Sequence, residues 1–474
     1  MDILVVAPEV APYIGSTGLA EVASALPKAL RGLGHRVTVA APLFRGVDPA
    51  ARSFARRLTK LEARLEGRTY ACELYDGRTP GGVEVSFIGH EEVLRGAAAL
   101  ESPGDAQEGV ALRAGVFAGA IVELVRARGA DVIHAHDWLG ALVAHQLAAR
   151  EVAVPVVLTV HDPSAQGRFD ASLAGALGLD DDRGEAARRD GSIGVLAAGL
   201  RSASRVTTVS PTFAREITRA PHGAGLEDVF EALGERLSGI LNGVDVSVWN
   251  PATDAELAAR FDPMDLSGKA RCKADLQRKF GLPVRRDTPL LGMVASETDE
   301  GGFDLFAKAA TQVLRNDCQV AVGWVGSEDA ELAGVLRELS ERWPDRLQVL
   351  ADTRPSVRHR LISGSDLVLV PSRRQPCGDT QMQAHRYGAL PIARRTGGLA
   401  DTIVDADPKL HTGTGFLFDR AEPEDLLAAV RRAFAAYDRE DAVDAMRRRV
   451  MTIDHSWERG ARLYERAYRD ASAA

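Results

Sequence analysis

The sequence alternates short runs of Val, Ile and Leu with longer stretches rich in Ala, Arg and Leu. This rhythm is typical of parallel β-strands joined by helices. It runs once over the first half of the chain and begins again near Leu290. Because 474 residues exceed the size at which single cores stop growing, the pattern predicts two domains. We expect two doubly wound α/β domains facing a cleft, with ligands at the carboxyl ends of their strands.

Candidate elements can be placed on this rhythm. The predicted strands are Ile3–Val6, Val37–Ala41, Asp131–Ala135, Pro155–Val160, Arg205–Val209, Leu290–Val294, Gln319–Gly323, Arg346–Leu350 and Leu367–Val370. A helix is predicted over Gly18–Leu33, where apolar residues recur at helical spacing. Asn250-Pro251 predicts a linker, since a residue before proline is pushed out of the helical region. The stretch from Asp170 to Asp190, rich in Asp, Arg and Gly, predicts an exposed insert.

Composition excludes several classes of function. A net charge of −8 disfavours nucleic acid and anionic membranes as partners. No apolar run approaches the ~20 residues needed to span a bilayer, and the first apolar run ends at Pro8, too early for a signal peptide. The four cysteines are widely spaced and form no zinc motif. We expect a cytoplasmic protein without metal or cofactor.

Three segments of the first half could carry chemistry. The turn from Gly15 to Gly18 joins the first strand to its helix, where backbone amides suit an anion, although a plain turn is an equal alternative. His134 and His136 share one strand face. They could bind a metal, but no third ligand is evident, and a polar substrate wall or supporting hydrogen bonds are favoured. His161 also ends a strand, where a lone histidine is usually a hydrogen-bonded core residue.

Two consecutive strand-to-helix loops stand out in the second half. One runs from Pro371 to Gln381 and the other from Arg394 to Leu399. Glycine-rich turns at neighbouring helix starts suit a pyrophosphate and a sugar. The alternative is ordinary helix capping by Thr380 or Thr396. Two such loops in succession favour binding.

Strings along nearly the whole chain resemble the bacterial glycogen synthase and starch synthase family. They are PEVAPY, GLAEVASALPKALRGLGHRVTVAAP, VIHAHDW, TTVSPTFAREI, LSGILNGVDVSVWNPATD, PSRRQPCGDTQMQAHRYGALPIARRTGGLADT, GTGFLF and SWERGARLYERAY. They follow the family's order. LNGVDVSVWNPATD and RYGALPIARRTGGLADT are the most specific.

The resemblance implies a GT-B fold with two Rossmann-like domains facing a central cleft. It implies an acceptor-side domain over 1–247, a nucleotide-sugar-binding domain over 248–455, and a C-terminal helix over 456–474 that crosses back to the first domain. The implied reaction is retaining transfer of glucose from ADP-glucose to the non-reducing end of an α-1,4-glucan such as glycogen. It needs no metal.

Matching positions imply roles for individual residues. The resemblance places His161 at the reacting sugar and Gly18 in the donor loop of the first domain. His134, His136, Asp137 and Trp138 are expected to line the cleft. The donor's glucose and phosphates are expected at Cys377, Gly378, Asp379, Thr380, Thr396, Gly397 and Gly398. We expect His161, Gln375, Gly378 and Thr396 to face one cleft.

The chain also departs from the family at charged positions. Gly15 replaces a family lysine, Ser296 an arginine, Gly301 a lysine, and Gln375 the glutamate that precedes Pro-Cys-Gly. Further departures are Ala165 for a tyrosine, Ala197 for a lysine, Asp162 for an asparagine, and an added acid at Glu297.

These departures remove groups that would stabilise charge on the leaving diphosphate. Arg373, Arg374 or Arg395 could compensate. Three hypotheses follow: a glycogen synthase with a remodelled and impaired site, an inactive paralogue that binds glucan or nucleotide, and a transferase of the same fold with another nucleotide-sugar donor.

Overall fold

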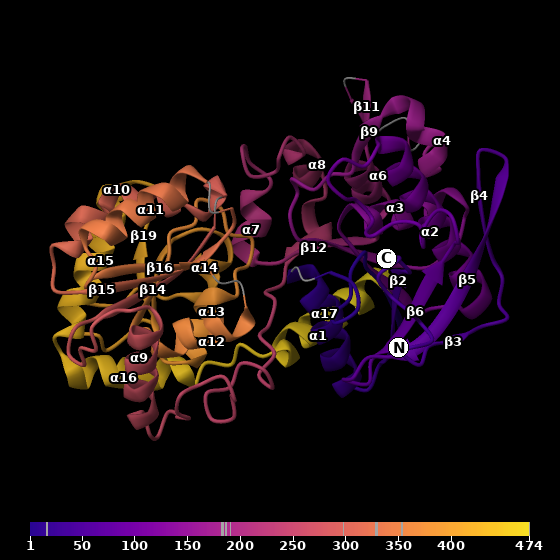
Figure 1. Ribbon diagram of the computed structural model, residues 1–474. Coiled ribbons are helices and arrows are strands. Elements are labelled where there is room, and N and C mark those ends of the chain that lie inside the picture. The colour runs from indigo at the N-terminus through magenta and orange to yellow at the C-terminus, as the bar shows by residue number, and fades with distance from the viewer. Residues whose placement is uncertain are drawn as a thin grey trace. The chain divides into compact units, whose positions relative to one another are not determined.

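The computed structural model describes residues 1–15, 18–181, 184, 187–189, 191–296, 298–327, 330–351 and 354–473. The chain divides into two compact units (Figure 1). The first unit comprises Met1–Gly243 with Trp457–Ala474, and the second comprises Val244–Ser456. Asn250-Pro251 therefore lies inside the second unit, a few residues beyond the division. Pro251 is buried there rather than exposed in a linker.

The first unit is built on a mixed sheet with the strand order β13-β12-β8-β7-β1-β2-β6-β5-β3, with β4 paired to β5. Its strands are β1 (Asp2–Val6), β2 (Arg36–Pro42), β3 (Ala55–Arg56), β4 (Leu61–Leu65), β5 (Arg68–Arg78), β6 (Glu84–Gly89), β7 (Val132–His136), β8 (Val156–Val160), β12 (Arg205–Thr208) and β13 (Leu237–Gly239). From β1 the chain builds outward through β2, then returns to place β7 on the other side of β1. Such a switch point is where open α/β sheets bind ligands.

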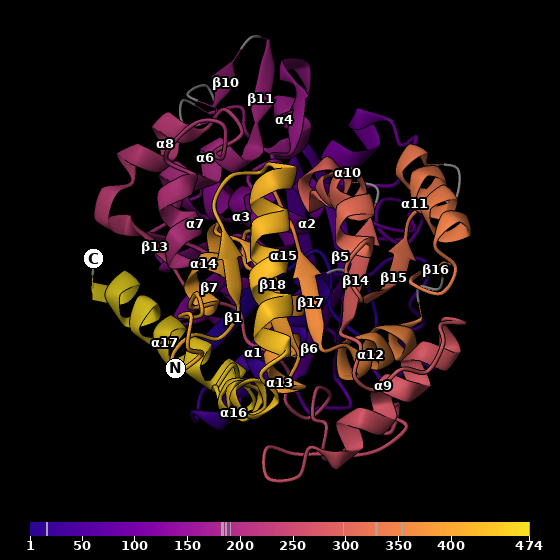
Figure 2. The same ribbon diagram turned by 90° about the vertical axis from the view of Figure 1, so that its left-hand side faces the viewer.

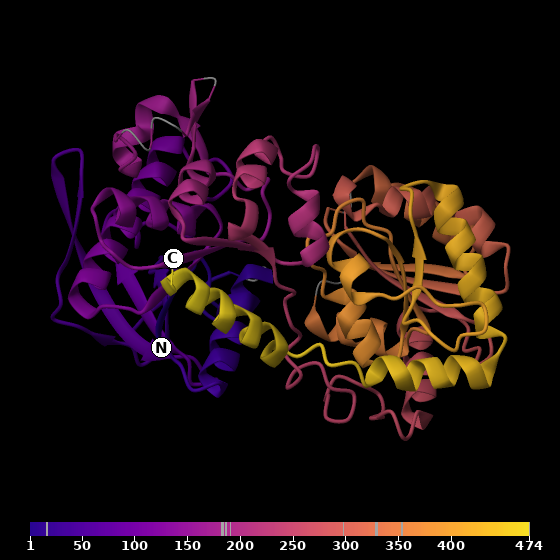
Figure 3. The ribbon, with the colours of Figure 1, turned by 180° about the vertical axis from the view of Figure 1, so that it is seen from behind.

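Helices surround this sheet. They are α1 (Gly18–Gly32), α2 (Gln107–Arg128), α3 (Asp137–Ala149), α4 (Ala174–Leu177), α6 (Val195–Ser202), α7 (Pro211–Glu216), α8 (Glu227–Ala232) and α17 (Trp457–Ala473). Although α17 ends the chain, it packs on α1 and along β7, β8 and β12 (Figure 3). Its apolar face is buried, with Tyr464 and Tyr468 fully enclosed.

The described residues of the predicted insert from Asp170 to Asp190 are only partly exposed. A small sheet, β9 (Arg168–Asp170), β10 (Arg188–Arg189) and β11 (Ser192–Gly194), frames it. Leu177 and Leu179 are fully buried, and α4 packs on α2. These two buried leucines hold the segment against the first unit, although its content of Asp, Arg and Gly predicted exposure to solvent.

The second unit has a parallel sheet with the order β16-β15-β14-β17-β18-β19. Its strands are β14 (Leu290–Ser296), β15 (Gln319–Val325), β16 (Leu347–Ala351), β17 (Leu367–Val370), β18 (Leu390–Arg394) and β19 (Phe416–Phe418). Alternate residues supply two cores: Leu291 and Met293 belong to one, and Leu290 to the other. Burial on both faces explains the continuous apolar runs. The switch point lies between β14 and β17.

Two layers of helices cover that sheet (Figures 1 and 2). The helices are α9 (Ser267–Lys279), α10 (Phe303–Leu314), α11 (Glu331–Arg342), α12 (Pro355–Gly364), α13 (Thr380–Arg386), α14 (Gly397–Thr402), α15 (Pro423–Tyr437) and α16 (Glu440–Met451). α10, α11 and α15 share the core that contains Leu291, whereas α9 and α12 share the other. Among the described helices, none combines the length and apolar character that crossing a bilayer requires.

A buried ion network lies where β17 begins. Asp366 pairs with the Nζ of Lys273 at 2.7 Å and accepts a 2.6 Å hydrogen bond from Arg447. It also accepts the amide of Leu290 at 3.0 Å, which joins β14 to β17. Burial alone would raise the pKa of Asp366, but Lys273 and Arg447 outweigh it and lower the pKa. The network therefore holds the sheet at the edge opposite the carboxyl ends.

Candidate functional site

Polar residues gather at the end of β7, which borders the switch point of the first unit, and at the end of its neighbour β8. His136 ends β7, and His161 directly follows β8. The two strands are parallel neighbours, with His136 opposite Thr159. His136 Nδ1 and His161 Nε2 lie 3.0 Å apart, a hydrogen-bond distance. The structure thus brings together two of the predicted histidines.

Asp137 fixes the backbone of His161. Its Oδ1 accepts the His161 amide at 2.8 Å. Asp137 has a φ of +50° at the start of α3, a left-handed conformation that aspartate tolerates better than most residues. Burial raises the pKa of Asp137, partly offset by His161. This carboxylate is an anchor for the end of β8.

His134 lies two residues before His136 on β7 and packs against the His136 ring. It is fully buried, and its Nε2 lies 2.7 Å from Thr159 Oγ1. Its Nδ1 lies 2.8 Å from the Tyr468 hydroxyl of α17. Both ring nitrogens are therefore engaged by the protein, which leaves none for a substrate. Of the two alternatives considered for His134, a substrate wall and supporting hydrogen bonds, these contacts favour the second. The centroid of its ring lies 4.3 Å from that of His136.

Burial keeps these imidazoles neutral. It lowers the pKa of His134 to about 3 and that of His136 well below the usual value. Burial also lowers the pKa of His161, against the smaller opposing effect of Asp137. A neutral imidazole has one donor and one acceptor nitrogen. His161, with Nε2 bound to His136, can offer its Nδ1 as a neutral hydrogen-bonding group.

The remaining predicted residues of the first unit have different surroundings. Trp138 is almost buried, and its ring packs on Phe169 and over Gly167. Gly15 has a φ of +77°, and a Cβ there would overlap the Glu9 side chain. Gly18 opens α1, where a Cβ would meet nothing within 4 Å. Ser16 and Thr17 lie outside the described residues.

In the second unit, the loops after β17 and β18 pack backbone against backbone. The Gly398 amide donates to the Gln375 carbonyl at 3.1 Å. A Cβ on Gly397 would lie 1.9 Å from that same carbonyl, and one on Gly398 would lie 2.0 Å from the Cys377 carbonyl. Both positions therefore require glycine for packing alone. The structure brings Gln375, Cys377, Gly397 and Gly398 together.

The start of α13 is held by a cation. Arg358 of α12 donates to Asp379 Oδ1 at 2.7 Å and to Thr380 Oγ1 at 3.1 Å. Gly378, with a φ of +74°, forms the turn before them. Neither α13 nor α14 has a side-chain cap, so Thr380 and Thr396 do not serve the capping role considered for them. Thr396 is buried at the start of α14.

The loop after β14 faces the loop after β17. The backbone of Ser296 ends β14, and Gly301 lies in a short helical turn, Asp299–Gly301. Glu297 lies outside the described residues. Opposite-charge pairs join the two loops: Arg373 with Asp304, and Arg374 with Glu300. The arginines that could compensate for missing family cations are thus already paired with acids.

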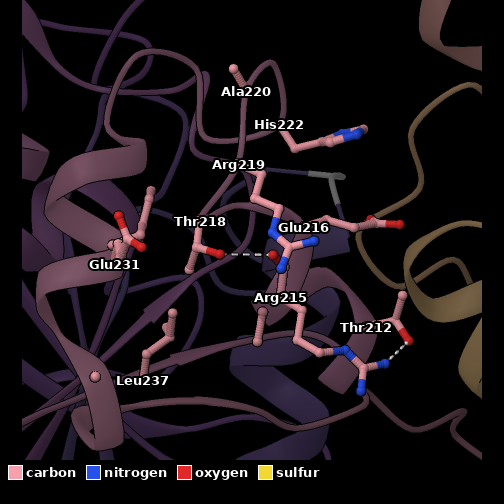
Figure 4. Close-up of a pocket in the computed structure, with 12 residues that line it drawn as sticks. Thr212, Arg215, Glu216, Thr218, Arg219, Ala220, His222, Glu231 and Leu237 are labelled. Carbon is pink, nitrogen blue, oxygen red and sulfur yellow. Dashed lines mark hydrogen bonds between the residues drawn. The ribbon is translucent and has the colours of Figure 1, made fainter.

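Other features of the described residues lie apart from the predicted site residues, including a pocket of about 850 Å³ beside Lys273 and Asp366. No group of three or more His, Cys, Asp or Glu side chains there could hold a metal ion. A surface depression of about 650 Å³ lies beside α7 and α8 (Figure 4). Arg215, Arg219 and His222 line it, and none of the predicted site residues does.

Comparison with known proteins identifies the chain. The family model "Starch synthase catalytic domain" matches residues 2–232, and "Glycosyl transferases group 1" matches residues 288–436. The glycogen synthase of Anaeromyxobacter sp. (strain Fw109-5) is 39% identical over 483 residues, with 100% of both chains covered. The chain belongs to the glycogen synthase family. A glycogen synthase from Kosmotoga olearia is 35% identical over 474 residues, covering 99% of this chain and 98% of the relative.

Solved structures of family members and of other glycosyltransferases confirm the predicted GT-B fold. The catalytic domain of starch synthase IV from Arabidopsis thaliana, bound to ADP and acarbose, matches with a TM-score of 0.86 and 29% identity. That match covers 100% of this chain and 99% of the other. Sucrose-phosphate synthase from Thermosynechococcus elongatus matches with a TM-score of 0.62 at 18% identity over 98% of each chain. The latter supports the fold alone.

Sequence reasoning about this glycogen synthase family member missed several partners. Tyr468 lies 334 positions from the histidine that it bonds, and Arg358 lies on a helix with no motif. One signal pointed to the ion pairs: Glu300 and Asp304 are acids that follow β14, and Arg373 and Arg374 are bases that follow β17. Because β14 and β17 are neighbouring parallel strands, the segments that follow them lie at the same edge of the sheet.

Tyr468→Phe should lower the protection of α17 against hydrogen exchange by about 1–3 kcal/mol, because a buried nitrogen of His134 loses its partner. Hydrogen-exchange mass spectrometry of α17 peptides measures this. Tyr464→Phe is the matched control, since its hydroxyl is not a partner of His134. Equal losses in the two variants would contradict a specific role for the bond between Tyr468 and His134.

Proposed function

We propose that this chain transfers glucose, with retention, from ADP-glucose to the non-reducing end of an α-1,4-glucan. The observation that carries the proposal is the full-length similarity to glycogen synthases, 39% identical with 100% of both chains covered. The matching starch synthase, bound to ADP and acarbose, supports a nucleotide-sugar donor and a glucan acceptor.

The geometry supports a division of labour between the units. In the second unit, backbone amides at the starts of α13 and α14 would donate hydrogen bonds to the phosphates of the sugar donor. Gly378 and Thr396 lie at those starts. In the first unit, we assign His161 to the transferred sugar, with Asp137 and His136 holding it. These roles suit glycosyl transfer without a metal.

A second candidate is an inactive paralogue that binds glucan or nucleotide. It is favoured by the paired state of Arg373, whose guanidinium donates to both carboxylate oxygens of Asp304. Positions 15, 296 and 301 carry no cation either. Charge on a leaving diphosphate would therefore be stabilised less than in a site with free lysine and arginine side chains. We accordingly propose slow turnover. We also propose a cytoplasmic location, since all four cysteines are free thiols, which suits a reducing compartment.

The test is release of ADP from ADP-glucose in the presence of glycogen, followed over a long incubation. We expect slow release that requires both substrates and that His161→Ala lowers by about 100-fold or more, as for loss of one preorganised contact at the reacting centre. UDP-glucose in place of ADP-glucose tests the alternative donor. No release above the His161→Ala background, with both proteins folded, would favour the inactive paralogue.

A further inference from the structure

We propose that Arg374 is the side chain with which this chain binds the diphosphate of its donor, and that Glu300 is an internal counter-ion that the diphosphate displaces. This inference rests on the proposed function, because it names the residue that recognises the donor in that reaction. It concerns two loops of the second unit, those after β14 and after β17.

Topology places both loops at the ligand-binding edge. β14 and β17 are parallel neighbours from which the chain builds outward in opposite directions. Ligands of such sheets bind outside the carboxyl ends at this point. The loops touch directly there, since the Arg373 amide donates to the Glu300 carbonyl at 2.8 Å. A Cβ on Gly302 would lie 2.2 Å from the Pro371 carbonyl.

Arg373 is committed to holding the two loops together. Its guanidinium donates to both oxygens of Asp304, at 2.5 and 2.8 Å, and to the Asp299 carbonyl at 2.9 Å. The hydrogen bonds from Arg373 are the largest cause that lowers the pKa of Asp304, to about 2, and Asp304 in turn raises the pKa of Arg373. A two-pronged pair of this kind is geometrically demanding and strong. Arg373 is therefore a structural clamp.

Arg374 is held in a more displaceable way. Its Nε and a terminal nitrogen meet a single oxygen of Glu300, at 2.9 and 2.8 Å. The Glu300 side chain is 55% exposed, whereas that of Arg374 is 11% exposed. Water can solvate the exposed Glu300 carboxylate once it leaves, whereas the nearly buried guanidinium still needs a negative partner, so Glu300 is displaced by a ligand that brings its own negative charge. The buried guanidinium stays in place when the exposed carboxylate turns away.

A diphosphate is the ligand that best replaces Glu300. It offers several oxygens and more negative charge than one carboxylate, and a guanidinium fork matches phosphate with paired hydrogen bonds. Glu300 is thus a competitor built into the site, and its removal should strengthen nucleotide binding.

The experiment measures ADP binding by titration calorimetry at one fixed salt concentration. Arg374→Ala should weaken binding at least about tenfold, the equivalent of one hydrogen bond to a charged group. Glu300→Gln should tighten it by about five- to tenfold. Asp299→Asn removes an equal charge one position away and should leave affinity within twofold. When Glu300→Gln is added to Arg374→Ala, it should not change the affinity for ADP any further, because the cation that Glu300 competes for is gone.

Arg374→Lys guards against misfolding, because it keeps the charge and should bind with intermediate affinity. Arg374→Ala that binds ADP as tightly as the parent would overturn the inference, as would equal effects of Glu300→Gln and Asp299→Asn. Turnover of ADP-glucose by the parent with an unresponsive Arg374 would sink this inference and leave the proposed function standing. If ADP affinity responds to Arg374→Ala and Glu300→Gln as expected but the parent does not turn over ADP-glucose, the inference stands and the proposed transfer reaction fails.

Discussion

Ser296→Arg, Gly301→Lys and Gln375→Glu, introduced together, should raise the rate of glucose transfer from ADP-glucose by about 100-fold or more. Removing one preorganised contact to developing charge typically costs about 10²–10³ in rate, so restoring such contacts should recover a comparable factor. The gains should be cooperative, since groups acting on one phosphate cluster are not independent. Glu297→Leu belongs in the set, because it removes an acid that the family pattern lacks at this position. Initial rates of ADP release measure the effect.

Gly15→Lys is left out of this set for a structural reason. Gly15 has a φ of +77°, and any side chain there would displace Glu9. The matched control replaces Ser296 and Gly301 by Gln, which adds bulk without charge and should change the rate little. A parent that already runs at ordinary synthase rates would refute the impairment. A folded variant that stays inactive would favour the inactive paralogue.

Asp366→Asn should destabilise the second unit by about 3–5 kcal/mol. The substitution leaves the buried Lys273 without its negative partner, and an uncompensated buried charge is costly. Differential scanning calorimetry should show the transition of that unit shifted down on the order of 10 °C. Because the folded-state pKa of Asp366 is lowered, its contribution is full above the unfolded value near 3.9 and is lost as pH falls through the folded value.

Asp444→Asn is the control for that experiment. Asp444 is the other carboxylate partner of Arg447, at 3.0 Å, but it lies one helical turn away on the surface and is partly exposed. Its loss should change stability by less than about 1 kcal/mol. A similar small effect for Asp366→Asn would mean that the network is not needed to hold β14 and β17 together.

Strands buried on both faces could be located from the sequence. Ile3–Val6, Leu367–Val370 and the other predicted strands appear with ends within two residues, because a parallel strand buried on both faces is a continuous apolar run. β5 was missed, since Arg68–Arg78 mixes charged and apolar residues along its length. β18 was missed because Leu390–Arg394 contains a proline and ends in arginine.

The site was predictable in its parts but not in its contacts. A period of two correctly placed His134 and His136 on one face. No local signal indicates that Tyr468 completes the surroundings of His134, because that contact depends on where α17 packs. The glycines at 397 and 398 suggested a phosphate cradle, yet the neighbouring loop alone already requires them. The sequence alone does not distinguish a glycine required for phosphate binding from one required for close packing of two loops.

The position of α17 also sets the order in which the protein can mature on the ribosome. Domains generally fold in the direction of synthesis, the N-terminal one first. Here the first unit includes residues that are translated after the entire second unit, namely Trp457–Ala474. Until they emerge, the surface that α17 covers on α1 and β7 is bare, and His134 lacks Tyr468. The surroundings of the histidines at the end of β7 are therefore completed only after the whole second unit has been translated, so a product that stops before Trp457 has an unfinished first unit.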